Sequence, residues 1–145
     1  MIIIEDSRNK IGKHNNILEH CKRYGIEIQR KVLNVGDYML PQGTKAIDTK
    51  QSIEELANDL YTDKLAFNKK YKKCVQDGIK LIVLIEEEIK TLSDLVSWES
   101  KHSLINGRYL LDLIDTVRVS YGVDFIFCNK KDTGKVIIKL LEGEE

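Results

Sequence analysis

The strongest constraint on this chain is a tight turn between two apolar segments with the composition of β-strands. Residues 41–43, Pro-Gln-Gly, favour a chain reversal, and strand-forming residues lie on both sides, at 38–40 and 46–47. An antiparallel hairpin centred between the last two turn residues pairs residues that are equally distant from its centre. The sequence therefore predicts that Asp37 and Asp48 face each other across the hairpin, directly or within one step.

Facing carboxylates need an explanation, because opposed side chains in such a pair lie about 5 Å apart at Cβ and like charges there repel. A divalent cation between Asp37 and Asp48 would remove that cost. Mg²⁺ suits such a site because it takes one or two carboxylates and keeps water ligands for a phosphate substrate. Lys50 follows Asp48 by two residues, so it projects from the same face of the strand and can reach a metal-bound water or phosphate. The alternative is a polar hairpin whose charged side chains all face water.

The rest of the chain alternates between apolar runs and amphipathic segments, which indicates an α/β fold with a mixed sheet. Its 145 residues form a single expected domain, 1–145, that is long enough to bury a core. Runs typical of buried strands occupy residues 2–4, 80–88 and 123–128, and residues 26–35 indicate a further strand. Helices are expected at residues 13–24, from Ser52 onward, 63–77, 91–99, 107–122 and 132–143.

Charge is balanced over the whole chain, with 23 Lys and Arg against 23 Asp and Glu. Binding of nucleic acid would therefore depend on local patches of positive charge. One candidate patch lies on a single face of the helix expected at 63–77, where lysines could follow a phosphate backbone. It consists of Lys69, Lys70, Lys72 and Lys73. The alternative is an ordinary solvated helix face.

Three cysteines, Cys21, Cys74 and Cys128, lie far apart among apolar residues, which favours buried free thiols in a reducing compartment. The N-terminal segment has no basic region, and no stretch is long enough to span a bilayer. These features predict a cytoplasmic protein without a membrane partner. The histidines share no metal-ligand spacing, and a glycine-rich phosphate loop is absent, so no organic cofactor is expected.

Further candidate residues follow buried strands, where sites collect in open α/β sheets. Asp6 could bind a metal and Arg8 could grip a phosphate, although a surface salt bridge is the simpler interpretation. Glu86 could add a carboxylate near this site. The simpler interpretation is that Glu86 is a surface glutamate. Segments 2–7 and 37–43 together imitate a phosphorelay receiver domain. The residues between them predict only one helix and one strand, which is too little for that fold.

Together these segments resemble the nuclease domain of the XPF family, within the PD-(D/E)XK nucleases. The family motifs V-D-x-R-E, G-D-Y and E-R-K-x-x-x-D correspond to residues 6–9, 36–38 and 48–54. The similarity covers nearly the whole chain and is greatest to small stand-alone members from phages and bacteria. It implies a restriction-endonuclease-like mixed β-sheet flanked by helices. Two departures stand out, because Asn9 replaces the glutamate of the first motif and Asp48 replaces that of the last.

The resemblance implies a metal-dependent endonuclease that hydrolyses DNA phosphodiester bonds, selective for branched, flap or junction DNA, in repair or recombination. Lys50 would orient the attacking water, and Arg8 would hold a phosphate. The implied setting is the cytoplasm of a bacterial or phage-infected cell. Mg²⁺, or Mn²⁺ in its place, would be held by Asp37, Asp48 and the carbonyl of Thr49, with Asp6 assisting.

A catalytically weak XPF-like domain that binds DNA or a partner protein is the alternative. Asn9 favours it, whereas the intact residues Asp37, Asp48 and Lys50 argue against it. A small-molecule α/β binder is less supported, because no phosphate loop is present.

A homodimer is also expected, because XPF-type nuclease domains commonly pair. Its interface would include the helix near 108–121, which carries more apolar residues than one inward face needs. A rival explanation is that Leu111 and Val119 pack under the terminal helix. The apolar residues in question are Tyr109, Leu110, Leu111, Leu113, Ile114, Val117, Val119 and Tyr121.

Overall fold

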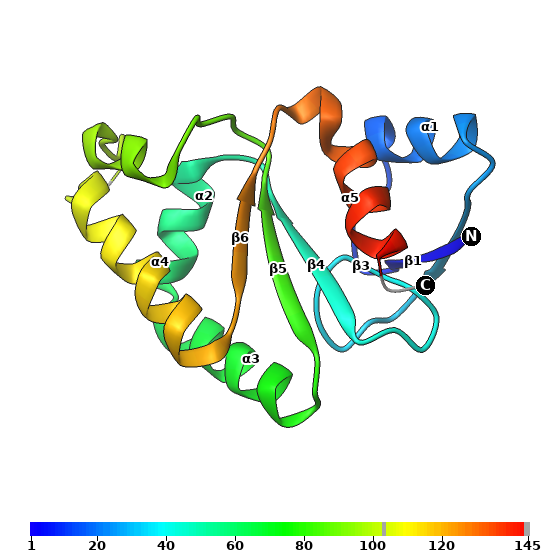
Figure 1. The fold of residues 1–145 in the computed structure, drawn as a ribbon, viewed down its shortest axis with the longest axis horizontal. Helices are drawn as coiled ribbons and strands as arrows, with labels where there is room; N and C mark the ends of the chain where they lie inside the picture. Colours follow the sequence, from blue (N-terminus) through cyan, green and yellow to red (C-terminus); the bar gives the residue numbers. More distant parts are fainter. Residues whose placement is uncertain (103, 144–145) are drawn as a thin grey trace.

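The computed structural model describes residues 1–102 and 104–143, which form a mixed β-sheet with helices on both faces (Figure 1). Six strands lie in the order β2-β1-β3-β4-β5-β6. β3 runs antiparallel to both of its neighbours, and the remaining neighbouring pairs are parallel. The strands are β1 (Ile2–Asp6), β2 (Glu27–Lys31), β3 (Tyr38–Met39), β4 (Lys45–Lys50), β5 (Lys80–Ile85) and β6 (Asp124–Phe127). The predicted α/β class with a mixed sheet is confirmed.

Helices cover the two faces of the sheet unequally (Figure 1). One face carries α1 (Asn15–Arg23) and α5 (Thr133–Glu142), which pack against each other. The other carries α2 (Ile53–Ala57), α3 (Lys64–Gln76) and α4 (Gly107–Tyr121). Short helical turns complete the chain: the π-helix η1 (Asn58–Thr62) and the 3₁₀ helices η2 (Leu92–Ser97) and η3 (Lys130–Asp132).

Side chains of β4 alternate between two hydrophobic cores. Ala46 belongs to the core under α2, α3 and α4, and Ile47 belongs to the core under α1 and α5. Asp48 and Lys50 follow Ala46 at two-residue spacing, so they project toward α2 and α3. Both are buried, as is Thr49 between them. Charged groups therefore occupy positions of a central strand that are otherwise filled by apolar side chains.

β2 is shorter than the strand expected at residues 26–35. It ends at Lys31, whose partner Asp6 is the last residue of β1. Because β1 offers no further backbone, residues 32–36 leave the sheet and cross to the start of the hairpin as a loop.

Two apolar residues of α3 are exposed rather than packed against the core. Phe67, Tyr71 and Cys74 pack against the core, whereas Leu65 is 81% exposed and Val75 is 56% exposed. Helical geometry explains the difference, since the first three residues fall within one narrow stripe while the other two lie opposite and beside it. The short helix expected at 91–99 is the 3₁₀ helix η2, which begins after a capping box at Thr91.

The inner face of α4 is formed by four buried residues, Leu110, Leu113, Ile114 and Val117. Leu111 and Tyr121 pack at the margin of the same core, which leaves Tyr109 and Val119 exposed. The rival explanation for the apolar excess was wrong, because α5 lies on the opposite face of the sheet (Figure 1).

All three cysteines are buried and free, as the sequence predicted. Over residues 1–102 and 104–143, no helix is long and apolar enough to cross a membrane.

Candidate metal and nucleic-acid site

The hairpin has the register that the sequence predicted. β3 and β4 pair Tyr38 with Ile47 and Met39 with Ala46. Asp37 directly precedes β3. Its backbone N–H donates to the carbonyl of Ile47 at 2.7 Å, although Ile47 is already the partner of Tyr38, so the chain is offset by one residue at this point. Asp37 therefore lies within one step of the position opposite Asp48.

Gly36 is required where the chain enters this hairpin. Its φ is +76°, a left-handed conformation that side chains disfavour. A Cβ at this position would also lie 3.0 Å from the carbonyl oxygen of Ile47 and 3.2 Å from the Cβ of Ala46. Gly36 therefore lets the backbone approach β4 closely enough to place Asp37 beside Asp48.

The carboxylate of Asp37 is held by Thr49. Its Oδ2 accepts hydrogen bonds from the Thr49 backbone N–H at 2.8 Å and from the Thr49 hydroxyl at 2.7 Å. Burial, and next the charge of Asp48, raise the pKa of Asp37, while the two Thr49 bonds oppose the shift only in part. Negative charge at Asp37 is thus only partly compensated by the protein itself.

The Thr49 carbonyl faces the same side of β4 as Asp37. The neighbouring Lys50 carbonyl accepts from the Glu86 N–H at 2.8 Å, which directs the backbone polar groups of Lys50 toward β5. Backbone groups alternate in direction along a strand, so those of Thr49 point the other way. The Thr49 N–H bond to Asp37 agrees with this orientation.

Asp48 is surrounded by positive charge. Its Oδ2 lies 3.0 Å from Lys70 Nζ and 3.4 Å from Lys50 Nζ. Burial disfavours the ionised carboxylate, but the two ammonium groups outweigh this effect and lower the pKa of Asp48. Both lysines also lie over the ring of Phe67, at 5.1 Å and 5.2 Å from its centroid.

Asp59 is a further carboxylate of this cluster. It lies on the π-helix η1, is buried, and has its Oδ2 2.5 Å from Lys50 Nζ. Burial raises the pKa of Asp59. Asp48 and Asp59 outweigh the burial of Lys50 and raise the pKa of Lys50 to about 12, so its side chain is an ammonium at neutral pH.

The first-motif residues adjoin the hairpin at the end of β1, where the Asp6 N–H donates to the Asp37 carbonyl at 2.8 Å. Both carboxylate oxygens of Asp6 accept from Arg8 Nε at 3.1 Å, and Oδ1 also accepts from the Leu33 N–H at 3.2 Å. Hydrogen bonding to Arg8 is the main effect that offsets burial and lowers the pKa of Asp6. Arg8 also donates to the Leu33 carbonyl. The amide nitrogen of Asn9 is buried and has no hydrogen-bond partner among the described residues.

The donor groups suit a hard divalent cation, since they are two carboxylates, Asp37 and Asp48, with a backbone carbonyl beside them. Burial and the neighbouring charge of Asp48 raise the pKa of Asp37, and a cation between the two carboxylates would stabilise the ionised form of Asp37. In the part of the chain that the structure describes, no three His, Cys, Asp or Glu side chains come together to share a metal. Asp6 therefore does not join Asp37 and Asp48 in one cluster.

Glu86 is buried rather than at the surface, so the simpler interpretation of this residue was wrong. Its carboxylate accepts from the Thr133 hydroxyl at 2.8 Å, at the start of α5. Glu86 follows Leu84 by two residues, and Leu84 belongs to the core under α1 and α5. The Glu86 side chain therefore lies on the face of the sheet opposite to Asp48.

A buried polar chain supports the hairpin from that opposite face. The Tyr38 hydroxyl lies 2.7 Å from Glu5 Oε2 and 2.6 Å from His14 Nδ1. His14 Nε2 is 3.3 Å from the Thr49 hydroxyl, which bonds Asp37. The chain therefore links the first helix to the residue that holds Asp37.

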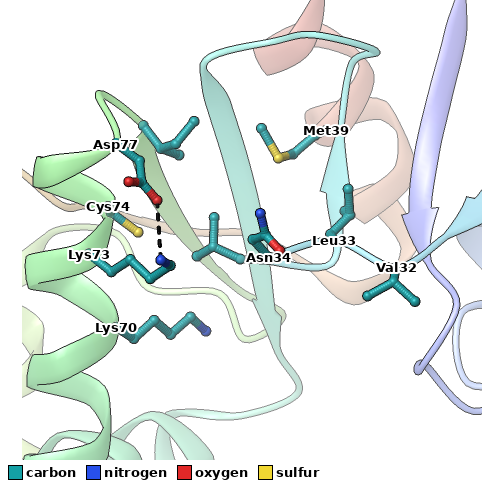
Figure 2. A pocket seen from close by; sticks show the side chains of 10 residues that line it. Val32, Leu33, Asn34, Met39, Lys70, Lys73, Cys74 and Asp77 are labelled. Carbon is teal, nitrogen blue, oxygen red and sulfur yellow. Dashed lines mark ion pairs between the residues drawn. The ribbon is translucent and has the colours of Figure 1, made fainter.

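A cleft of about 700 Å³ is lined in part by Lys70, the lysine that pairs with Asp48 (Figure 2). α3 forms one wall, with Lys70, Lys73, Cys74 and Asp77, and loop residues 32–35 with Met39 and Ile79 form the rest. Lys69, Lys72 and Lys73 are exposed on α3. Of the four lysines expected to bind nucleic acid, Lys70 alone forms an ion pair with Asp48.

Sequence reasoning missed two residues of this arrangement. Asp59 lies three residues after Leu56 on the inward face of a helical segment, and a charge on an apolar face was the signal that could have found it. His14 precedes α1 in a polar segment, and no pattern there distinguishes it from a surface residue.

Comparison with known families gives a match to the ERCC4 domain over residues 6–140. The chain belongs to the ERCC4 domain family. The resemblance to an XPF-type nuclease domain is thereby confirmed. A comparison with curated proteins found no match for this ERCC4 domain.

Solved structures with the same fold include XPF from Aeropyrum pernix, with a TM-score of 0.72 and 20% identity over 98% of this chain. A second is the same protein in complex with DNA, with a TM-score of 0.69 and 19% identity over 97% of this chain. The ERCC4 domain described here spans 64% and 63% of those two chains, which is less than two thirds of their length.

Proposed function

We propose that this ERCC4 domain is a metal-dependent DNA endonuclease that hydrolyses phosphodiester bonds in branched, flap or junction DNA. The observation that carries the proposal is the buried pair Asp37 and Asp48, brought close together by the hairpin, with Lys50 beside Asp48 on the same face of β4. Buried charge is costly unless it is paired or holds a metal, and such groups cluster at functional sites. DNA in the complex of the XPF relative supports the substrate class.

Mg²⁺, or Mn²⁺, would be held by Asp37, Asp48 and the Thr49 carbonyl, where it would lower the pKa of a bound water and offset charge on the phosphate. Lys50 acts as a hydrogen-bond donor rather than a base, because its raised pKa keeps it protonated. Its ammonium orients the attacking water and stabilises charge that develops in the transition state. Thr49 fixes the position of the Asp37 carboxylate through two hydrogen bonds. Arg8 follows β1, and its side chain is largely exposed although it bonds Asp6 and the Leu33 carbonyl, so it would hold a phosphate from the solvent side.

Digestion of labelled duplex, flap, fork and four-way junction DNA tests this function. Cleavage that requires Mg²⁺ or Mn²⁺ and stops with chelator is the expected result. The comparison among substrates would identify the preferred DNA structure. Absence of cleavage on every substrate, with both metals present, would contradict the proposal.

The alternative is a catalytically weak domain that binds DNA or a partner protein. Two observations favour it: Asn9 stands where the family has glutamate, and the Asp6 carboxylate is bound by Arg8 rather than grouped with Asp37 and Asp48. DNA binding without cleavage on the same substrates would select this alternative.

DNA binding should depend on the exposed lysines of α3 and weaken with salt. Replacing Lys69, Lys72 and Lys73 by Gln removes up to three phosphate contacts, and each contact contributes a slope of about 0.9 in a plot of log affinity against log salt. We expect weaker binding and a slope reduced by about two to three, measured by fluorescence anisotropy. A matched control replaces three exposed lysines near α5, which are Lys130, Lys131 and Lys135. Equal salt slopes for the two variants would mean that DNA does not bind at the exposed lysines of α3.

A homodimer is the second part of the proposal. Tyr109 and Val119 remain exposed on α4 after the core is filled, and they offer an apolar surface for a second copy. Light scattering at micromolar concentration is expected to give twice the monomer mass, and Val119→Asp is expected to restore the monomer. A monomer mass that persists as the concentration rises would rule out the dimer and leave the nuclease proposal intact.

A further inference from the structure

Two lysines contact one oxygen of Asp48, but they are held very differently. Lys50 comes from the central strand β4, its side chain is 11% exposed, and it has a second carboxylate partner, Asp59, at 2.5 Å. Lys70 comes from the surface helix α3, its side chain is 28% exposed, and its one ion pair within the described residues is with Asp48. Lys70 is therefore the more easily displaced of the two.

The oxygen that Lys70 occupies belongs to a carboxylate proposed to hold the metal. A divalent cation on Asp48 and the Lys70 ammonium at 3.0 Å from Oδ2 would repel each other strongly at this separation. Lys50 cannot give way without leaving Asp59 as an unpaired buried charge, which is costly. Lys70 has space to move, because it lies at the wall of the cleft between α3 and the loop at residues 32–35 (Figure 2).

We propose that Lys70 is a built-in competitor for the metal, which holds Asp48 in the metal-free protein and is displaced into the adjoining cleft when a divalent cation binds. The inference rests on the proposed function, because it needs a metal at Asp37 and Asp48. Lys70 then acts as a positioning residue for Asp48. The displaced ammonium joins Lys73 on the wall of the cleft, where a DNA phosphate can meet both.

Metal affinity gives the sharpest test, because the proposal predicts that loss of a lysine improves binding. Mn²⁺ is titrated into the protein without DNA, and free Mn²⁺ is followed by electron paramagnetic resonance. Lys70→Gln is expected to bind Mn²⁺ about three- to fivefold more tightly, which is the release of one partly exposed ion pair. Lys73→Gln is the matched control, because Lys73 lies in the same cleft but pairs with Asp77 at 3.8 Å. Its affinity is expected to change less than twofold.

Chemical labelling provides an independent readout in the wild-type chain. Brief acetylation followed by mass spectrometry measures the reactivity of each lysine with and without Mn²⁺. Modification of Lys70 should increase severalfold when the metal is present, while Lys73 stays constant. Circular dichroism on each variant verifies that the fold is retained.

The outcomes separate the inference from the function on which it rests. Mn²⁺ binding by the wild type, lost in Asp48→Asn but no tighter in Lys70→Gln, would overturn the role of Lys70 and leave the metal site standing. No Mn²⁺ binding by the wild type at millimolar concentration would overturn both. Tighter binding by Lys70→Gln and Lys73→Gln alike would show a general charge effect and would also overturn the inference.

Discussion

Asp37→Asn is expected to lower metal-dependent DNA cleavage by about 10²–10³-fold or more, because one metal ligand and its charge are removed from the transition state. The change keeps the size of the side chain, and its oxygen can still accept the Thr49 N–H bond. Single-turnover cleavage of the best substrate, with saturating Mg²⁺, measures the loss. Cleavage by the purified variant at the wild-type rate would show that Asp37 is not a metal ligand.

The same substitution should leave stability unchanged or increase it. The pKa of Asp37 is raised in the folded state, so the protonated form favours folding and this stabilisation is lost as the pH rises through the folded pKa. Asparagine is uncharged at every pH, so the variant retains this stabilisation at neutral pH. Urea unfolding in the presence of chelator checks the sign. Activity and stability that fall together would indicate a misfolded variant rather than a lost ligand.

Gly107→Ala is expected to destabilise the fold by about 3 kcal/mol or more, because there is no room for a methyl group. A Cβ on Gly107 would lie 1.6 Å from the carbonyl oxygen of Leu95 and 2.9 Å from that of Trp98. Both contacts are backbone, so relief requires that α4 move away from η2. Urea denaturation measures the change as a lower midpoint with an unchanged slope.

Gly143→Ala is the matched control for this prediction. Its φ is −61°, and the nearest atom to an added Cβ is the Leu140 carbonyl oxygen at 3.7 Å, an ordinary contact. We expect a stability change within about 0.5 kcal/mol for this variant. Equal urea midpoints for Gly107→Ala and the wild type would mean that the first residue of α4 does not pack closely against η2.

Local signals in the sequence were sufficient for the hairpin and the sheet class. The Pro-Gln-Gly turn fixed the pairing of β3 with β4, and continuous apolar runs identified β1 and β5 as buried strands. The length of β2 could not be obtained in this way. It depends on where its partner β1 ends, which is a property of the pair rather than of either segment.

Much of the candidate site was also accessible from local spacing, because Asp37, Asp48 and Lys50 lie on one hairpin. Contacts between distant segments were not. Lys70 contacts Asp48 from α3. Asp59 contacts Lys50 from a π-helical turn, and no residue pattern in the sequence predicts such a turn. The Asp6 carboxylate bonds Arg8 and the Leu33 N–H, and Leu33 belongs to a loop whose path sequence reasoning did not predict.

The bond from the Thr49 N–H to Asp37 also gives the protein an internal spectroscopic reporter. An amide proton is deshielded according to the strength of the hydrogen bond it donates, and this one ends on a carboxylate oxygen at 2.8 Å. Any cation that draws electron density from Asp37 weakens that bond and shifts the Thr49 resonance in a proton–nitrogen correlation spectrum. Titration of the metal can therefore be followed at a single backbone position, in the wild-type chain, without substrate and without a label on the site.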